Sequence, residues 1–242
     1  MSVRCPAPLL PAMLSLLAGI AACAHGKDLG PEQPANVTDE RPKIDRGPTS
    51  TDSDIGGLSQ EDVEDQFKTL HPRFLDCVQR TSSRINYVGG RVALRMRITK
   101  QGEVRWAYLT ESTLGDRDAE RCVLDVVRHQ TWPRPLSGEG LAESSFEVDP
   151  SEAPITWPQY KTAALADRAM GVTRRCRKGI GGTFQATAYV GPKGDVIAAG
   201  VAPPNSKGEE VADCFAEALR AIQVGNLTVG QRKAAKVSFA IR

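Results

Sequence analysis

The sequence predicts an α+β protein made of two tandem units, each with the order helix–strand–strand–helix–strand. Two observations predict it. Short stretches of apolar–polar alternation, typical of strands, lie between stretches with helical periodicity. Distinctive residues also recur at a constant spacing of 92: Gly102-Glu103-Val104 returns as Gly194-Asp195-Val196, and Cys122 returns as Cys214. Because a constant spacing indicates an internal repeat, we place the units at residues 59–150 and 151–242.

Caps and apolar spacing indicate the helices of the first unit. Ser59 is a candidate N-cap, and apolar residues follow at helical spacing up to Pro72, where we expect a kink. Asp116 is a candidate N-cap for a second helix, which turns Cys122 inward and ends at Trp132.

Alternation indicates the strands of the same unit. Residues 92–98 alternate between apolar and polar side chains, which predicts a strand with one buried face. A tight turn at residues 100–103 leads into a returning strand that begins at Val104. Phe146 and Val148 mark the last strand.

The second unit repeats this order. Thr156, with Gln159 three residues later, forms a capping box for a helix that we expect to continue to about Lys178. The remaining elements follow in turn: a strand over residues 184–190, a turn at 191–195, a helix from about 209 to 222 and a strand over 237–241.

Residues 1–22 have the pattern of an export signal. A lone Arg4 precedes an apolar stretch, residues 9–20, that is too short to span a bilayer. It ends in Ile20-Ala21-Ala22-Cys23, which resembles a lipobox, and the resemblance implies that Cys23 carries lipid. The alternative is an ordinary cleavage site beside a chance cysteine. Residue 24 is not aspartate, so nothing resembles an inner-membrane retention signal, and we expect an outer-membrane lipoprotein that faces the periplasm or is displayed at the surface.

Residues 23–58 predict a disordered tether. This segment is rich in proline and acidic residues and has no aromatic side chain. It therefore cannot bury enough apolar surface to offset the entropy lost on ordering.

Four cysteines lie in the two units, and an exported protein meets an oxidising compartment, where disulfides form. If each unit folds alone, the repeat selects the pairs Cys77–Cys122 and Cys176–Cys214. A four-cysteine zinc site is the alternative, but no two of these cysteines have the close spacing of zinc ligands.

Composition and motifs argue against several function classes. The chain has 31 basic and 29 acidic residues and 5% aromatic residues, which is unlike a nucleic-acid-binding protein. It has no nucleophile-elbow, phosphate-loop or zinc-protease motif. We expect His71 and His129 to have capping or surface roles near helix ends rather than catalytic ones. We expect no enzyme activity, cofactor or metal.

The unit resembles the TonB C-terminal domain superfamily, most closely the AgmX/PglI-type domain of gliding-motility-associated proteins. The residues that carry the resemblance in the first unit are Cys77, Gly90-Arg91-Val92, Gly102-Glu103-Val104, Ser112-Thr113-Leu114, Cys122 and Trp132-Pro133. The second unit keeps the glycine and cysteine landmarks but has Pro203-Pro204-Asn205 in place of Ser-Thr-Leu. The resemblance implies, for each unit, a three-stranded antiparallel sheet packed against two helices, with a sheet edge that can accept a partner strand.

These observations predict a lipid-anchored scaffold of the cell envelope that binds other envelope proteins. The alternative is a component of an energised TonB-type import system, although this chain has a lipid signal where TonB has a membrane-anchoring helix. The final strands, residues 144–148 and 237–241, are the candidate edges, and the expected partner-binding residues are Ser144, Ser145, Phe146, Glu147 and Val148.

The second unit is also expected to lie near an anionic surface. It has 13 basic and 7 acidic residues, whereas the first unit has 13 basic and 15 acidic residues. Four cations gather where its first helix is expected to end, namely Arg174, Arg175, Arg177 and Lys178. Complementation of the helix dipole on a solvated end is the alternative interpretation.

Overall fold

The computed structural model describes residues 50–55, 57–82, 85 and 88–242. The chain is a mixed α+β protein, and we call residues 50–150 its first half and 151–242 its second half. The elements of the first half are β1 (Ser50–Ile55), α1 (Gln60–Ser82), β2 (Gly90–Ile98), β3 (Val104–Ser112), α2 (Arg117–Arg128) and β4 (Gly140–Val148).

The second half repeats the order of helices and long strands. Its elements are β5 (Ile155–Thr156), α3 (Gln159–Thr173), the 3-10 turn η1 (Arg174–Cys176), β6 (Phe184–Val190), β7 (Val196–Ala202), α4 (Ser206–Glu209), α5 (Ala212–Arg220), the 3-10 turn η2 (Gly225–Thr228) and β8 (Ala235–Ile241).

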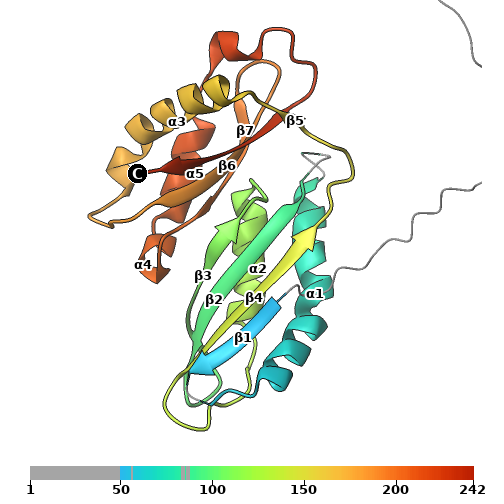
Figure 1. Ribbon diagram of the computed structural model, residues 1–242, viewed down its shortest axis with the longest axis vertical. Coiled ribbons are helices and arrows are strands. Elements are labelled where there is room, and N and C mark those ends of the chain that lie inside the picture. Colours follow the sequence, from blue (N-terminus) through green and yellow to red (C-terminus); the bar gives the residue numbers. More distant parts are fainter. Residues whose placement is uncertain (1–49, 56, 83–84, 86–87) are drawn as a thin grey trace, which may run out of the picture. The chain divides into compact units, whose positions relative to one another are not determined.

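Each half has one sheet, and each sheet has a strand that the sequence did not predict (Figure 1). The expected three antiparallel strands are present as β4-β2-β3 and β8-β6-β7. β1 adds to β4 in antiparallel orientation, and the short β5 adds to β8 in parallel orientation. The sheets therefore have four strands each, and residues 50–55 of the expected tether belong to a sheet.

Apolar side chains of α1, α2 and one face of the sheet form the core of the first half. Trp132 lies at its centre, with its ring centroid 4.8 Å from that of Phe67, and its indole N–H donates to the carbonyl of Val127. Asp116 caps α2 as expected, since its carboxylate accepts from the amides of Asp118 and Ala119. Pro72 lies within α1, which runs through it as one continuous helix.

A pair of stacked rings organises the core of the second half, where the centroids of Phe184 and Phe215 lie 4.1 Å apart. Three boundaries differ from the sequence-based expectation. Thr156 pairs in β5 and α3 begins at Gln159 after Pro158, so Thr156 is not its cap. The helix expected from about 209 to 222 is α5, which spans only Ala212–Arg220, and the separate short helix α4 precedes it. The helix expected to reach Lys178 ends at Thr173 and continues as η1.

The two halves form one compact unit. The first core extends across the boundary, because Tyr189, Ala198 and Ala202 of the second half pack into it. Lys236 of β8 also reaches the first half, where its ammonium donates to the carbonyl of Gly89 at 2.6 Å. Burial of this ammonium lowers its pKa to about 8.

Candidate functional site

The expected partner-binding strand of the first half is β4, and it does not border its sheet. Ser144 and Ser145 pair with Leu94 and Ala93 of β2 on one side and with Thr51 and Ser50 of β1 on the other. This corrects the expectation of an open edge, since the chain itself supplies the neighbouring strand. The composition of β1, Ser-Thr-Asp-Ser-Asp-Ile, has no apolar alternation, so main-chain pairing rather than a side-chain pattern defines this strand.

The other three residues expected to bind a partner continue the same strand. Phe146 is a core residue and stacks on Phe74 with 5.1 Å between centroids. Glu147 pairs with Arg91 and Val148 with Gly90, both in β2. Phe146 therefore has a structural role in the core.

The corresponding strand of the second half, β8, is covered over a shorter length. β6 pairs with β8 along its whole length from Ala235 to Ile241. On the opposite side, β5 pairs only with Ala235 and Lys236. Among the residues that the structure describes, no strand lies beside the stretch from Val237 to Ile241 on that side.

Strand geometry fixes which amides of β8 point away from β6. The carbonyl of Ala234 accepts from Ile155 on the β5 side, and main-chain groups alternate in direction along a strand. The amides of Ser238 and Ala240 therefore point to the uncovered side. The short contact between the hydroxyls of Thr187 and Ser238 (2.8 Å) agrees with this assignment, because side chains approach most closely in a non-hydrogen-bonded pair.

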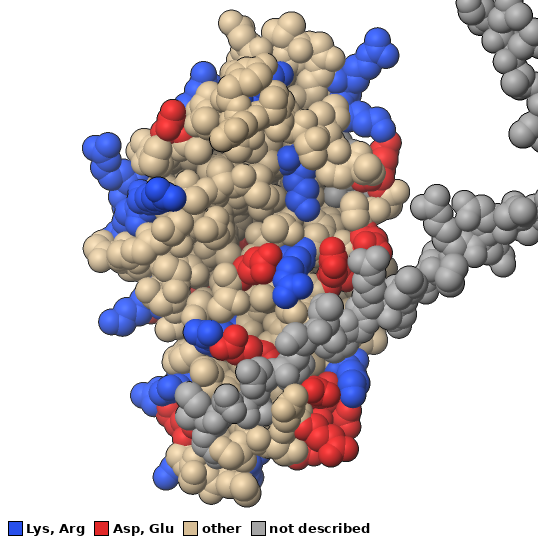
Figure 2. Space-filling view, viewed as in Figure 1, with Lys and Arg blue, Asp and Glu red and all other residues tan. Residues whose placement is uncertain are grey.

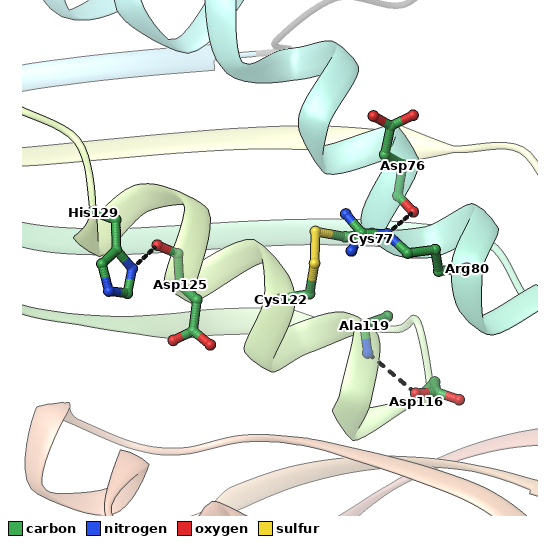
Figure 3. The surroundings of a disulfide bond; sticks show 8 residues. All are labelled: Asp76, Cys77, Arg80, Asp116, Ala119, Cys122, Asp125 and His129. Atoms are coloured by element: carbon green, nitrogen blue, oxygen red, sulfur yellow. Dashed lines mark hydrogen bonds between the residues drawn. A yellow bond between two sulfur atoms is a disulfide. The ribbon is translucent and has the colours of Figure 1, made fainter.

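One disulfide in each half joins its helical segments. Cys77 of α1 bonds to Cys122 of α2, and Cys176 of η1 bonds to Cys214 of α5, which are the pairs that the repeat selects. The first bond lies between α1 and α2 (Figure 3), at a surface hollow of about 410 Å³ that Arg73, Arg121 and other charged side chains line. These bonds indicate that the protein resides in an oxidising compartment outside the cytoplasm.

Charged side chains meet in a buried cluster between the halves, which the sequence analysis did not anticipate. Arg117 of α2 donates to Glu209 of α4 at 2.6 Å and to Asp213 of α5 at 2.7 Å. Glu120, one turn along α2, is fully buried; it accepts from the hydroxyl of Ser112 and from the amide of Val201 in β7. The sequence could have indicated a buried carboxylate here, because Glu120 occupies a position in the apolar stripe of α2.

Burial perturbs both buried carboxylates. It raises the pKa of Glu120 to about 7, although Arg117 and the two hydrogen bonds oppose the shift. It also raises the pKa of Glu209, again against the effect of Arg117. A side chain at residue 200 would overlap the Glu120 carboxylate, which explains the glycine there.

The basic residues at the end of α3 divide into two kinds. Arg174, Arg175 and Lys178 are exposed. Arg177 is half-buried: its guanidinium donates to the carbonyls of Gly182 and Ile241 and lies over the ring of Phe184. It therefore has a structural role and is withdrawn from the expected anionic-surface site.

The outer face of the first sheet carries charges of both signs, which lie side by side in Figure 2. Its arginines pair with acidic residues: Arg91 with Glu111, Arg95 with Glu143 and Arg97 with Glu139. Because the charges are paired, this face is not a basic surface for a polyanion.

Of the two histidines in the described halves, His129 lies at the end of α2 as expected, whereas His71 lies in the middle of α1 and not near a helix end. The ring of His129 contacts the carbonyl of Asp125 at the end of α2, and the ring of His71 lies edge-on to Phe146. In the described ranges, no group of three or more histidine, cysteine, aspartate or glutamate side chains could hold a metal ion, and no helix is long and apolar enough to cross a membrane.

Cys23, the expected lipid attachment site, lies outside the described residues, as do the export signal and the tether up to residue 49. Comparison with protein-family models, with curated proteins and with solved structures finds no match for this chain.

Proposed function

We propose that this chain is a lipid-anchored, non-enzymatic binding protein of the bacterial cell envelope, built from two tandem copies of one module. It holds other envelope proteins by adding an extended segment of the partner to the uncovered edge of β8. Its resemblance to the TonB C-terminal superfamily supports this function, because edge-strand addition is the binding mode that the resemblance implies.

The observation that carries the proposal is the difference between β4 and β8. In the first half, the equivalent edge accepts an extended segment, β1, in antiparallel orientation through main-chain pairing. In the second half, the side of β8 from Val237 to Ile241 has no neighbouring strand among the described residues. The β1–β4 pair therefore provides a template for how a partner segment lies on β8.

The sequence supports export and lipid anchoring, and the disulfides support a location outside the cytoplasm. Ile20-Ala21-Ala22-Cys23 resembles a lipobox, which places the chain at a membrane through lipid on Cys23. The disulfides agree with an extracytoplasmic compartment. We place the protein at the outer membrane because residue 24 is not aspartate.

A binding role also agrees with the chemistry of the described surface. The buried carboxylates, Glu120 and Glu209, are held by Arg117 and by main-chain and hydroxyl donors within the fold. We therefore assign them to the joining of the halves rather than to acid–base catalysis. The exposed cations Arg174, Arg175 and Lys178 would favour an acidic partner or anionic headgroups nearby.

A crosslinking pull-down from membranes tests the proposal. We expect the wild-type protein to recover a discrete envelope partner, Ser238→Pro to lose it and Ser238→Ala to keep it. Both variants lose the hydroxyl contact with Thr187, but only proline removes the outward amide. Equal recovery by both folded variants would contradict edge addition at β8. Recovery of inner-membrane motor subunits would favour a TonB-type import system over an adaptor.

A further inference from the structure

Equivalent positions of the two halves touch one another. Arg117 pairs with Glu209 and Arg121 lies 3.8 Å from Asp213, and in both pairs the partners are 92 residues apart, which is the spacing of the repeat. A residue contacts its own equivalent only near the axis of a two-fold arrangement. These pairs therefore indicate that the halves are related by an approximate two-fold axis beside α2.

The contacts between elements follow the same symmetry. β3 lies against β7, its own equivalent. α2 contacts β7, and in return α4, which precedes α5 in the second half, contacts β3. The interface is thus of the kind that two copies of one module form. Near the axis, the first half supplies arginines and the second half supplies carboxylates.

The same symmetry relates two hollows of very different size. The larger, of about 430 Å³, lies against Arg105, Trp106 and Ala107 of β3 and beneath Glu209. The smaller, of about 20 Å³, lies against the equivalent residues of β7 and beneath Arg117, the equivalent of Glu209. Arg128 lines the larger hollow, and its equivalent Arg220 lines the smaller one.

Ile85 explains why the second hollow is small. Its side chain is 4% exposed and lines this hollow beside Arg117 and the β7 residues Ile197 and Ala198. Ile85 lies in the connection between Cys77 and the glycine pair, which is seven residues longer in the first half than in the second. The equivalent connection of the second half, between η1 and β6, is shorter, and none of its described residues lines the larger hollow.

Glu209 contributes a buried carboxylate to the wall of the larger hollow. The side chain of Glu209 is 8% exposed, and its Oε2 has no hydrogen-bond partner among the described residues, whereas its Oε1 accepts from Arg117. Because protein atoms enclose this oxygen, the hollow offers a partner its apolar wall at Trp106 and Ala107 rather than an open acceptor.

We propose that this hollow binds an extended segment of another protein, which inserts one branched aliphatic side chain against Trp106 and Ala107. The occupant takes the place that Ile85 fills at the equivalent site. The hollow suits a peptide with charges of both signs, because its lining includes the cations Arg105 and Arg121 and the carboxylates Glu210 and Asp213. This surface is separate from the edge of β8.

The probe is an acetylated and amidated heptapeptide with the sequence of residues 82–88, in which Ile85 is the central residue. A second peptide carries aspartate at that position. Binding to the folded protein is followed by NMR at the indole N–H of Trp106. We expect the isoleucine peptide to bind with a dissociation constant of about 0.1–1 mM, and the aspartate peptide to bind at least about tenfold more weakly because it lacks the apolar side chain.

Two variants on α4 test the place of binding. Ser206 lines the hollow and the neighbouring Lys207 is exposed and does not, so Ser206→Trp should abolish binding and Lys207→Trp should leave it unchanged. Equal binding of the two peptides, unchanged binding in Ser206→Trp, or no binding of either peptide up to about 5 mM would overturn the proposal. Near-UV circular dichroism verifies that each variant is folded. If Ser206→Trp does not fold, the comparison of the two peptides on the wild-type protein still tests the proposal.

Discussion

Arg117 and Glu209 lie at equivalent positions of the two halves, and their side chains form a buried ion pair with an N–O distance of 2.6 Å. A buried ion pair contributes little net stability, but removal of one partner is strongly destabilising because the other charge stays buried without compensation. We expect Arg117→Met to lower the free energy of unfolding by about 3–5 kcal/mol in urea denaturation.

Arg121 provides the matched control. It lies one turn further along α2 and close to Asp213, but both side chains are at least half exposed. Arg121→Met should change stability by less than about 1 kcal/mol. Similar losses in the two variants would contradict a special role for the buried cluster.

Glu120 should make stability depend on pH near neutrality. Its pKa is about 7 in the folded protein, above its ordinary value of 4.5, so its contribution is complete below about pH 4.5 and is lost as the pH rises through 7. Glu120→Gln keeps an acceptor for Val201 and a donor for Ser112 without the charge. The variant should match the wild type near pH 4.5 and exceed it at pH 8 by an amount on the order of 3 kcal/mol.

Urea denaturation of both proteins at a series of pH values gives this difference directly. Glu209, whose pKa is also raised, remains in both proteins. Its contribution to the pH dependence of stability therefore largely cancels when the two are compared. A stability difference that is constant between pH 4.5 and 8 would show that Glu120 does not titrate in this range.

The two disulfides should stabilise the halves to similar extents, because they close chain segments of similar length, with separations of 45 and 38 residues. Chain entropy predicts a loss of about 4 kcal/mol for each pair replaced by alanine. Denaturation of Cys77→Ala/Cys122→Ala and of Cys176→Ala/Cys214→Ala measures both losses. A loss below about 1 kcal/mol for either pair would be incompatible with this account.

Replacement of Arg177 by lysine should destabilise the protein, whereas the same replacement at the neighbouring exposed arginines should not. Its planar guanidinium donates to the carbonyls of Gly182 and Ile241 and lies over two aromatic rings, which one ammonium group cannot do together. We expect Arg177→Lys to cost about 1–2 kcal/mol in thermal or urea unfolding and exposed Arg174→Lys to cost less than about 0.5 kcal/mol. Equal effects would contradict the structural role of Arg177.

Cys23→Ala should release the protein from membranes and abolish labelling with a radioactive or clickable fatty acid, because it removes the expected thiol for lipid attachment. Membrane fractionation of wild type and variant measures the first effect. Labelling that persists in the variant would contradict the lipobox interpretation.

Side-chain patterns made much of the fold predictable. The alternation through Val92, Leu94, Met96 and Ile98 marks β2, whose even-numbered side chains are all buried. Asp116 marks the start of α2, and the repeated cysteines mark the helix pairs that the disulfides join. In each case a local pattern and the tertiary packing favour the same structure.

Elements that depend on long-range pairing were not predictable in this way. β1 and β5 have no alternating pattern of their own and exist as strands because β4 and β8 offer them main-chain partners. The contact of Glu120 with Val201 spans 81 residues, and an acidic residue in an apolar stripe does not reveal its partner. The sequence therefore suggested β4 as the open edge, although β1 covers it.

Site-specific photo-crosslinking in cells tests edge recognition at β8 most directly. A photoreactive residue in place of Ala240, on the uncovered stretch, should give one discrete crosslinked partner. The same crosslink should disappear when Ser238→Pro is added and persist when Ser238→Ala is added, because only the proline removes a main-chain donor. A crosslink of equal yield in both backgrounds, with the protein folded and exported, would contradict strand addition at this edge.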